Sequence, residues 1–116
     1  MAEALARAKH LRVSPRKLRL VADMVRGKRV AEARDILAFT QKAGAPLLRK
    51  VLNSAVANAE SKAAEERARI DADEMIIKQL LVDEGVTWKR FRAAPRRRAV
   101  RIRKRTSHIQ MVISEP

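Results

Sequence analysis

The fold of this chain depends on residues 86–108, which read VTWKRFRAAPRRRAVRIRKRTSH. This basic arm holds ten Lys and Arg residues and no Asp or Glu. It leads directly into residues 109–113, IQMVI, whose alternating apolar residues are typical of a strand. A charge run can be a solvated face or a disordered tail, but the strand-like run that follows favours an ordered basic element.

Two long antiparallel strands are expected around the centre of the basic arm, over residues 75–92 and 98–113, with a connection near residues 93–97. A strand of 18 residues would extend about 60 Å. A compact domain of this length has a radius of gyration of only about 13 Å. The residues alone therefore leave two alternatives: either the strands break, or a basic hairpin projects from the body.

Within the second expected strand, the apolar residues change from even to odd sequence positions, a change of apolar parity. Val100 and Ile102 occupy even positions, whereas Ile109, Met111 and Ile113 occupy odd positions. A strand with one buried face needs a bulge or twist near residues 106–108 to do this. The alternative is that the two parts serve different surfaces, one on the core and one on a partner.

Two amphipathic helices are expected early in the chain. The first begins at Ser14-Pro15, a favoured N-cap followed by a favoured first helical residue, and ends at Gly27. The second fits residues 30–39. Both carry an apolar stripe at helical spacing, so we expect them to pack on one core.

A third helix, rich in small residues, is expected to begin at Pro46 and to end near Glu60, before a polar loop that reaches Glu74. Asn53 and Asn58 on this helix could hydrogen-bond RNA or fill a gap in the packing. The first nine residues are ambiguous: they are Ala-rich by propensity, yet a strand over residues 8–13 is an alternative.

The composition narrows the class of protein. The chain has 116 residues, with 27 Lys plus Arg against 13 Asp plus Glu, and a net charge of +14. We therefore expect a single domain with a polyanionic partner. Cys is absent, which excludes a disulfide scaffold and Cys-ligated zinc. No apolar run reaches the ~20 residues of a membrane span, and the N-terminus lacks a secretory apolar stretch. We expect no cofactor, no metal and no membrane partner.

A second, weaker basic cluster covers residues 7–29, with nine cations against Asp23. Arg16, Lys17 and Arg19 start the first helix, where Ser14 and the exposed first-turn amides could also hold a phosphate. The alternative is an ordinary solvated basic face.

Catalytic interpretations find little support. His10 and His108 have no acidic pair or third ligand at a recognisable spacing. A nuclease would need carboxylates such as Asp83 and Glu84 to converge around metal ions, and cleavage would be lost on replacing either. A free DNA- or RNA-binding regulator is the other alternative. It predicts a symmetric dimer with a spaced site, but the sequence offers no evident recognition helix or dimer seam.

Several stretches, in order, resemble one family. They are VSPRK at 13–17, LVAD at 20–23, VRGK at 25–28, KVLNSA at 50–55, ANAE at 57–60, VDEG at 82–85, KRF at 89–91 and RKRTSHI at 103–109. Their order and spacing resemble the bacterial-type large-subunit ribosomal protein L twenty-two family, over about residues 8–114.

The resemblance implies an α+β fold, with three helices packed on a small antiparallel sheet and a long projecting basic β-hairpin. It thus favours projection of the hairpin. It implies a single domain over residues 1–116, with a body of about 8–82 and 109–114 and a hairpin of about 83–108. The chain would be a structural constituent of the large ribosomal subunit, without enzymatic activity, that binds large-subunit rRNA and supports subunit assembly. It would act in the cytoplasm, with an organellar ribosome as the alternative.

The partners that the resemblance implies are several domains of large-subunit rRNA, neighbouring large-subunit proteins and the nascent polypeptide, with no homo-oligomer. The hairpin would help to line the peptide exit tunnel near the macrolide site. The implied RNA-binding residues are Arg12, Ser14, Arg16, Lys17, Arg19, Arg26, Lys28, Lys89, Arg90, Arg92, Arg96, Arg97, Arg98, Arg101, Arg103, Lys104, Arg105, Thr106, Ser107 and His108. The implied tunnel-lining tip is Arg92, Ala93, Ala94, Pro95, Arg96, Arg97 and Arg98.

The tip departs from the family pattern at one position. Arg97 stands where Gly is common, and Gly supplies the positive φ of a tight turn more readily than Arg. The conformation of the tip and any effect on macrolides are therefore left open.

Overall fold

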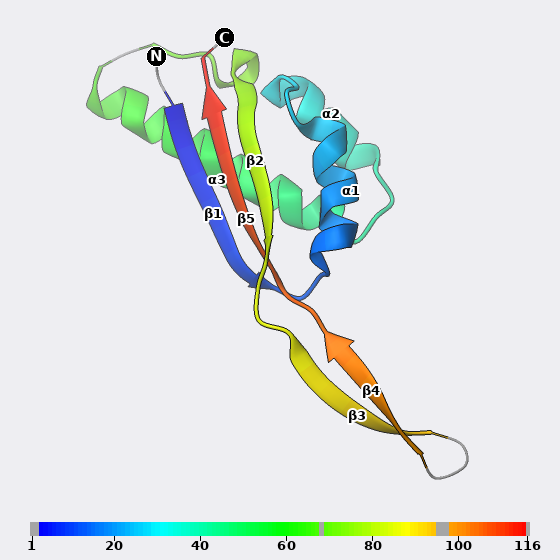
Figure 1. The fold of residues 1–116 in the computed structure, drawn as a ribbon. Coiled ribbons are helices and arrows are strands. Elements are labelled where there is room, and N and C mark those ends of the chain that lie inside the picture. Colours follow the sequence, from blue (N-terminus) through cyan, green and yellow to red (C-terminus); the bar gives the residue numbers. More distant parts are fainter. Residues whose placement is uncertain (1–2, 68, 95–97, 116) are drawn as a thin grey trace.

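The computed structural model describes residues 3–67, 69–94 and 98–115, and it describes residues 88–94 and 98–104 by their backbone alone. The elements, in chain order, are β1 (Glu3–Leu11), α1 (Pro15–Val25), α2 (Val30–Phe39), α3 (Gly44–Glu65), the 3₁₀ helix η1 (Ala72–Glu74), β2 (Ile76–Glu84), β3 (Trp88–Ala94), β4 (Arg98–Lys104) and β5 (Ser107–Ser114) (Figure 1).

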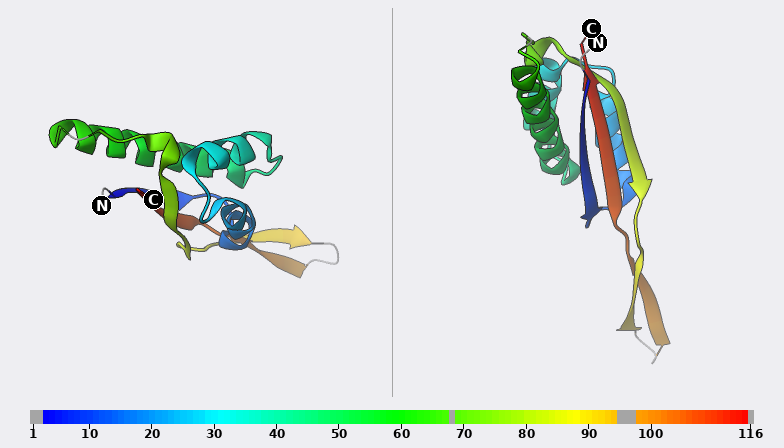
Figure 2. Two further views of the ribbon diagram at one scale, coloured as in Figure 1. Left: turned by 90° about the horizontal axis from the view of Figure 1, so that it is seen from above. Right: turned by 90° about the vertical axis from the view of Figure 1, so that its left-hand side faces the viewer.

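The body is a three-stranded antiparallel sheet of order β1-β5-β2 with helices packed on it. Helix α3 lies across β1 and β5, whereas α1 packs beside β2 (Figure 2). The core between them includes Leu18 of α1, Leu52 of α3, Ile77 of β2 and Met111 of β5, all fully buried. The predicted α+β class, with three helices on a small antiparallel sheet, is confirmed.

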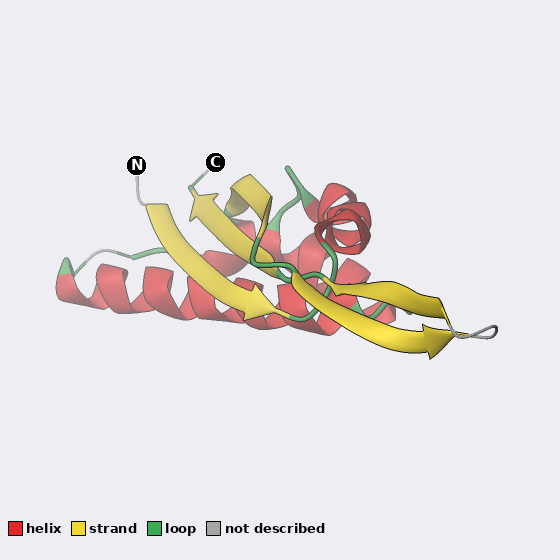
Figure 3. Cartoon of the chain, turned by 60° about the horizontal axis from the view of Figure 1, so that its bottom comes forward, coloured by secondary structure: helices red, strands yellow, loops and turns green. Residues whose placement is uncertain are grey.

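The hairpin forms a separate two-stranded sheet of β3 and β4 that extends away from the helices (Figure 3). The molecule measures 66 × 26 × 15 Å and has a radius of gyration of 17.5 Å, well above the roughly 13 Å of a compact domain of this length. Both alternatives therefore hold, since the long strands break and a hairpin also projects from the body. The strands break at residues 85–87 and 105–106, which we call the junction, and the hairpin continues beyond it. The break at 105–106 also accounts for the change in apolar parity.

Helix α1 follows the predicted pattern closely. The Ser14 hydroxyl accepts a hydrogen bond from the Lys17 N–H at 3.4 Å, as an N-cap does. The apolar stripe, Leu18, Val21, Ala22 and Val25, is fully buried.

Two boundaries differ from the prediction. Strand β1 begins at Glu3, because alternate residues Ala4 and Ala6 are buried beneath α3. Helix α3 runs from Gly44 to Glu65 and does not end near Glu60. Its last turns continue because Ala63 is still buried in the body, and this packing outweighs the polar local sequence.

Candidate nucleic-acid interface

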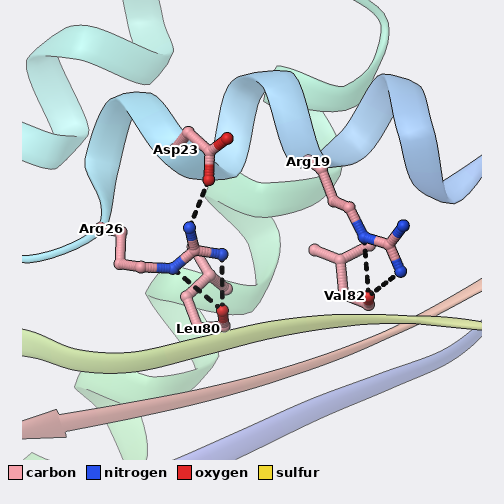
Figure 4. A network of polar contacts seen from close by, with 5 residues as sticks. All are labelled: Arg19, Asp23, Arg26, Leu80 and Val82. Atoms are coloured by element: carbon pink, nitrogen blue, oxygen red, sulfur yellow. Dashed lines mark hydrogen bonds and ion pairs between the residues drawn. The ribbon is translucent and has the colours of Figure 1, made fainter.

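The basic residues of α1 divide into two groups, and the first group holds the fold together. Arg19 donates from Nε and Nη2 to the Val82 carbonyl, at 3.3 and 3.0 Å. Arg26 donates from Nε and Nη2 to the Leu80 carbonyl, at 3.2 and 2.9 Å, and also contacts Asp23 (Figure 4). Both guanidinium groups therefore anchor α1 to β2.

The location of β2 explains these contacts. It is an edge strand, so its outward carbonyls have no partner strand and need other donors. The segment after α1 also donates hydrogen bonds to this edge, from its backbone. The Gly27 N–H donates to the Ile77 carbonyl, and the Val30 N–H donates to the Met75 carbonyl. Arg19 and Arg26, predicted to bind RNA, thus have a structural role first. Each keeps further guanidinium N–H groups for another partner.

Helix α3 covers the opposite edge of the sheet in the same way. The Asn58 amide donates to the Leu5 carbonyl at 2.9 Å, and the Lys62 ammonium donates to the Glu3 carbonyl at 3.4 Å. Asn58 therefore contacts the β1 edge, which favours the packing alternative over the RNA alternative for this residue.

The second group of basic residues on the body is exposed and makes no side-chain hydrogen bond or ion pair to the described part of the chain. The predicted contact residues in this group are Arg12, Arg16, Lys17, Lys28 and Arg105. Long cationic side chains without an internal partner are available to an external anion. This group is the described core of the candidate interface.

Three predicted contact residues lie in or beside the junction and face inward. Ser107 is fully buried, and its hydroxyl donates to the Val13 carbonyl. Thr106 is 6% exposed, and its hydroxyl donates to the Val86 carbonyl at 2.7 Å. These two hydroxyls are enclosed and already bonded within the protein, and RNA binding by their side chains stays a prediction.

His108 is half-buried next to them. Its Nδ1 accepts a hydrogen bond from the His10 N–H at 3.1 Å, and the two imidazole rings meet edge to face, with centroids 5.0 Å apart. His10 has a φ of 60° at the irregularity between β1 and β5. His108 therefore supports a strained backbone turn at His10, and its contact with RNA stays a prediction.

The predicted contact residues of the hairpin are placed by backbone register. Lys89 pairs with Arg103, Phe91 with Arg101, and Ala94 with Arg98. The remaining predicted residues on the two strands are Arg90, Arg92, Ala93 and Lys104. Pro95, Arg96 and Arg97 of the predicted tip lie outside the described residues, and so does the turn in which Arg97 replaces the common Gly.

The catalytic alternatives gain nothing from the structure. Asp83 and Glu84 are exposed on β2. Within residues 3–67, 69–94 and 98–115, no three His, Cys, Asp or Glu side chains gather as a metal site. Among the same residues, no helix is both long and apolar enough to cross a membrane.

One exposed residue was missed by the sequence reasoning. Phe39, the last residue of α2, is 85% exposed. The signal was present in the sequence, because Phe39 lies two positions after the buried Leu37 and so points about 200° away from it on the helix.

The fold and its charge define a small basic α+β protein whose helical body carries an extended cationic ribbon. The sequence matches the family described as Ribosomal protein L22p/L17e over residues 6–114. It is 53% identical over 113 residues to the large ribosomal subunit protein uL22 of Maridesulfovibrio salexigens, which covers 97% of this chain and 98% of the relative.

Two further relatives bear the same name. The protein of Oceanobacillus iheyensis is 50% identical over 113 residues, covering 97% of this chain and 96% of the relative. The protein of Bifidobacterium longum is 50% identical over 112 residues, covering 97% and 94%. The chain therefore belongs to the ribosomal protein L22p/L17e family. It is a ribosomal protein, a ribonucleoprotein component of translation in a family that is structural in kind.

Proposed function

We propose that the chain is a structural constituent of the large ribosomal subunit that binds 23S-type rRNA and supports subunit assembly. The observation that supports this most is the basic arm, which has ten cations and no acid in its sequence and whose strands β3 and β4 form a ribbon separate from the sheet of the body. Its register places Lys89 directly opposite Arg103. Like charges at opposed positions destabilise a strand pair, and a polyanion on both sides relieves this repulsion.

The contacting residues in this proposal come from the body and from the hairpin. Those of the body are Arg12, Ser14, Arg16, Lys17, Lys28 and Arg105, with Arg19 and Arg26 as secondary contacts. Those of the hairpin are Lys89, Arg90, Arg92, Arg96, Arg97, Arg98, Arg101, Arg103 and Lys104. Arg suits this role because its planar guanidinium binds phosphate through two hydrogen bonds and stacks on bases. Such contacts position the protein and carry little sequence information.

The hairpin would reach deep into the subunit, between several rRNA domains. In this arrangement its tip, residues 92–98, would help to line the peptide exit tunnel near the macrolide site and would contact the nascent polypeptide. The body would lie beside neighbouring large-subunit proteins, and the chain would act as a monomer in a cytoplasmic ribosome.

Sedimentation of a cell lysate in a sucrose gradient, repeated after a high-salt wash, tests the proposal. Phosphate contacts of a surface-adsorbed cation weaken by roughly 10³–10⁵ between 50 and 200 mM salt for six to ten contacts. A ribbon threaded between rRNA domains stays with the large subunit through the wash. Release into the light fractions would instead support the free-regulator alternative.

A charge-matched pair of variants separates the two groups of α1. Arg16→Ala with Lys17→Ala should lower the slope of log affinity against log salt by about 0.7–0.9 for each lost phosphate contact. Arg19→Met with Arg26→Met removes the same number of charges. It should lower the free energy of unfolding by about 1 kcal/mol per residue, because the β2 carbonyls lose their donors. The same salt slope in both variants, with unchanged stability, would contradict this division.

A further inference from the structure

Phe39 is the most exposed of the large hydrophobic residues in the described chain, at 85% of its surface. It ends α2, and the chain then leaves the helix through Thr40, whose hydroxyl donates to the Ile36 carbonyl at 2.6 Å. The ring is therefore presented at a defined corner of the body. An aromatic ring in this position has no packing role within the described residues.

The corner that carries Phe39 is fixed to the body. Helix α3 begins at Gly44, where a Cβ would lie 2.8 Å from Leu18 Cδ2, so its first turn packs directly on α1. The Ala45 N–H donates to the Lys42 carbonyl at 3.1 Å across the turn. A ligand at Phe39 would therefore meet a surface that is already ordered, which lowers the entropic cost of binding.

The charge around this corner is net positive, and its nearest acid in the sequence is the exposed Asp35, one turn before Phe39 on α2. Residues 36–59 contain no Asp or Glu. They contain three exposed cations, Lys42, Arg49 and Lys50, and none of them forms an ion pair with another described residue. The first turn of α3 has no acidic residue, so the positive end of the helix dipole adds to this field.

We propose that Phe39 stacks on an unpaired base of the rRNA while Lys42 and Arg49 contact the flanking phosphates. A base has an apolar face for the ring and an anionic backbone for the cations, which matches both halves of this surface. The inference rests on the proposed rRNA binding and adds a contact site remote from the basic arm.

The test uses the full chain and a transcript of 23S-type rRNA, with affinity measured over a range of salt concentrations. Phe39→Leu keeps an apolar side chain but removes the ring, so it should weaken binding by about 5- to 150-fold, the value of one stacked base. The salt slope should stay unchanged, because no phosphate contact is lost. Phe39→Trp should retain the affinity. Lys42→Ala should instead lower the slope by about one unit.

Leu5→Ala is the matched control, since Leu5 is an exposed apolar residue on β1, outside this corner. It should bind as the unchanged chain does. Ultraviolet zero-length cross-linking in the reconstituted subunit should join the peptide that contains Phe39 to rRNA, and Phe39→Leu should remove this cross-link alone.

Three results would overturn the stacking contact while rRNA binding stands. They are unchanged affinity of Phe39→Leu, equal loss in Phe39→Leu and Phe39→Trp, or a cross-link from position 39 to a ribosomal protein and not to RNA. Failure of the unchanged chain to bind the transcript would instead overturn the proposed function itself.

Discussion

Replacing Gly85 with Ala should destabilise the junction between body and hairpin. A Cβ at position 85 would lie 2.5 Å from Thr106 Oγ1, and 3.1 and 3.2 Å from Cε1 and Nε2 of His108. Thr106 cannot move away freely, because its hydroxyl donates to the Val86 carbonyl and its carbonyl accepts from the Gly85 N–H at 2.9 Å. His108 is likewise held by the His10 N–H. The added methyl group therefore forces apart the two segments of the junction, residues 85–87 and 105–106.

The cost follows from this crowding. Overpacking of a well-filled site costs about 1–3 kcal/mol, and the reduced entropy of the unfolded chain returns about 0.4–1 kcal/mol. We expect a net loss of about 1–2 kcal/mol in the free energy of unfolding. At about 4 °C per kcal/mol for a chain of this size, Tm should fall by about 4–8 °C.

Urea unfolding of the full chain, followed by circular dichroism, measures this loss, with Val86→Ala as the control. Val86 is a neighbour with 60% exposure, so its replacement should change stability by less than about 0.5 kcal/mol. Thr106→Ala removes Oγ1 and should cost about 1 kcal/mol by itself. Combined with Gly85→Ala it should cost less than the sum, because the shortest contact, with Oγ1, has gone and only the contacts with His108 remain. Strict additivity, or an unchanged midpoint for Gly85→Ala, would refute the packing argument.

Three further predictions concern the body. Gly27 has a φ of 80°, and nothing lies within 4 Å of the place that a Cβ would take. Gly27→Ala should therefore lower the free energy of unfolding by about 1–2 kcal/mol through backbone strain alone. Gly27→Asn should lower it by less in the same urea assay. Leu52 is fully buried, so Leu52→Ala should lose about 2–5 kcal/mol; a smaller loss would mean that the core closes over the cavity. The hydrogen bond from Lys78 and its charge hold the pKa of the Glu3 carboxyl below its ordinary value. The resulting stabilisation is present at neutral pH and is lost as pH falls through the folded-state pKa, and an NMR titration should show Lys78→Met raising that pKa toward the ordinary value.

Local signals predicted the first two helices well, because their information lies within a few residues. Ser14-Pro15 and Gly27 mark the ends of α1, and its apolar stripe is the buried face. The end of α3 could not be predicted in this way. Its last turns are polar in composition and stay helical where Ala63 is still buried, which the local sequence does not indicate.

The charge of the sequence predicted the regions that form the candidate site, but it did not predict which basic residues in them are free of contacts within the protein. Arg16 and Arg19 are indistinguishable in the sequence, and only the location of the β2 edge gives Arg19 two hydrogen bonds within the protein. Thr106 and Ser107 follow a run of cations, yet both are buried. The change of parity beside them indicated a break, and a break is where a hydroxyl is needed to satisfy freed carbonyls.

Side chains of α1, of its C-cap Arg26 and of α3 cover both sheet edges, which affects how the chain behaves without a partner. An open strand edge is a template on which another chain can add a strand, and such additions lead to aggregation. Arg26 on one edge and Asn58 on the other occupy carbonyls that a neighbouring copy would need. Pairing between two hairpins is opposed in another way, because the Lys and Arg residues of one hairpin repel those of the other. In a chain with a charge of +14, two separate features thus oppose edge-to-edge pairing with another copy, one made of hydrogen bonds and one of charge.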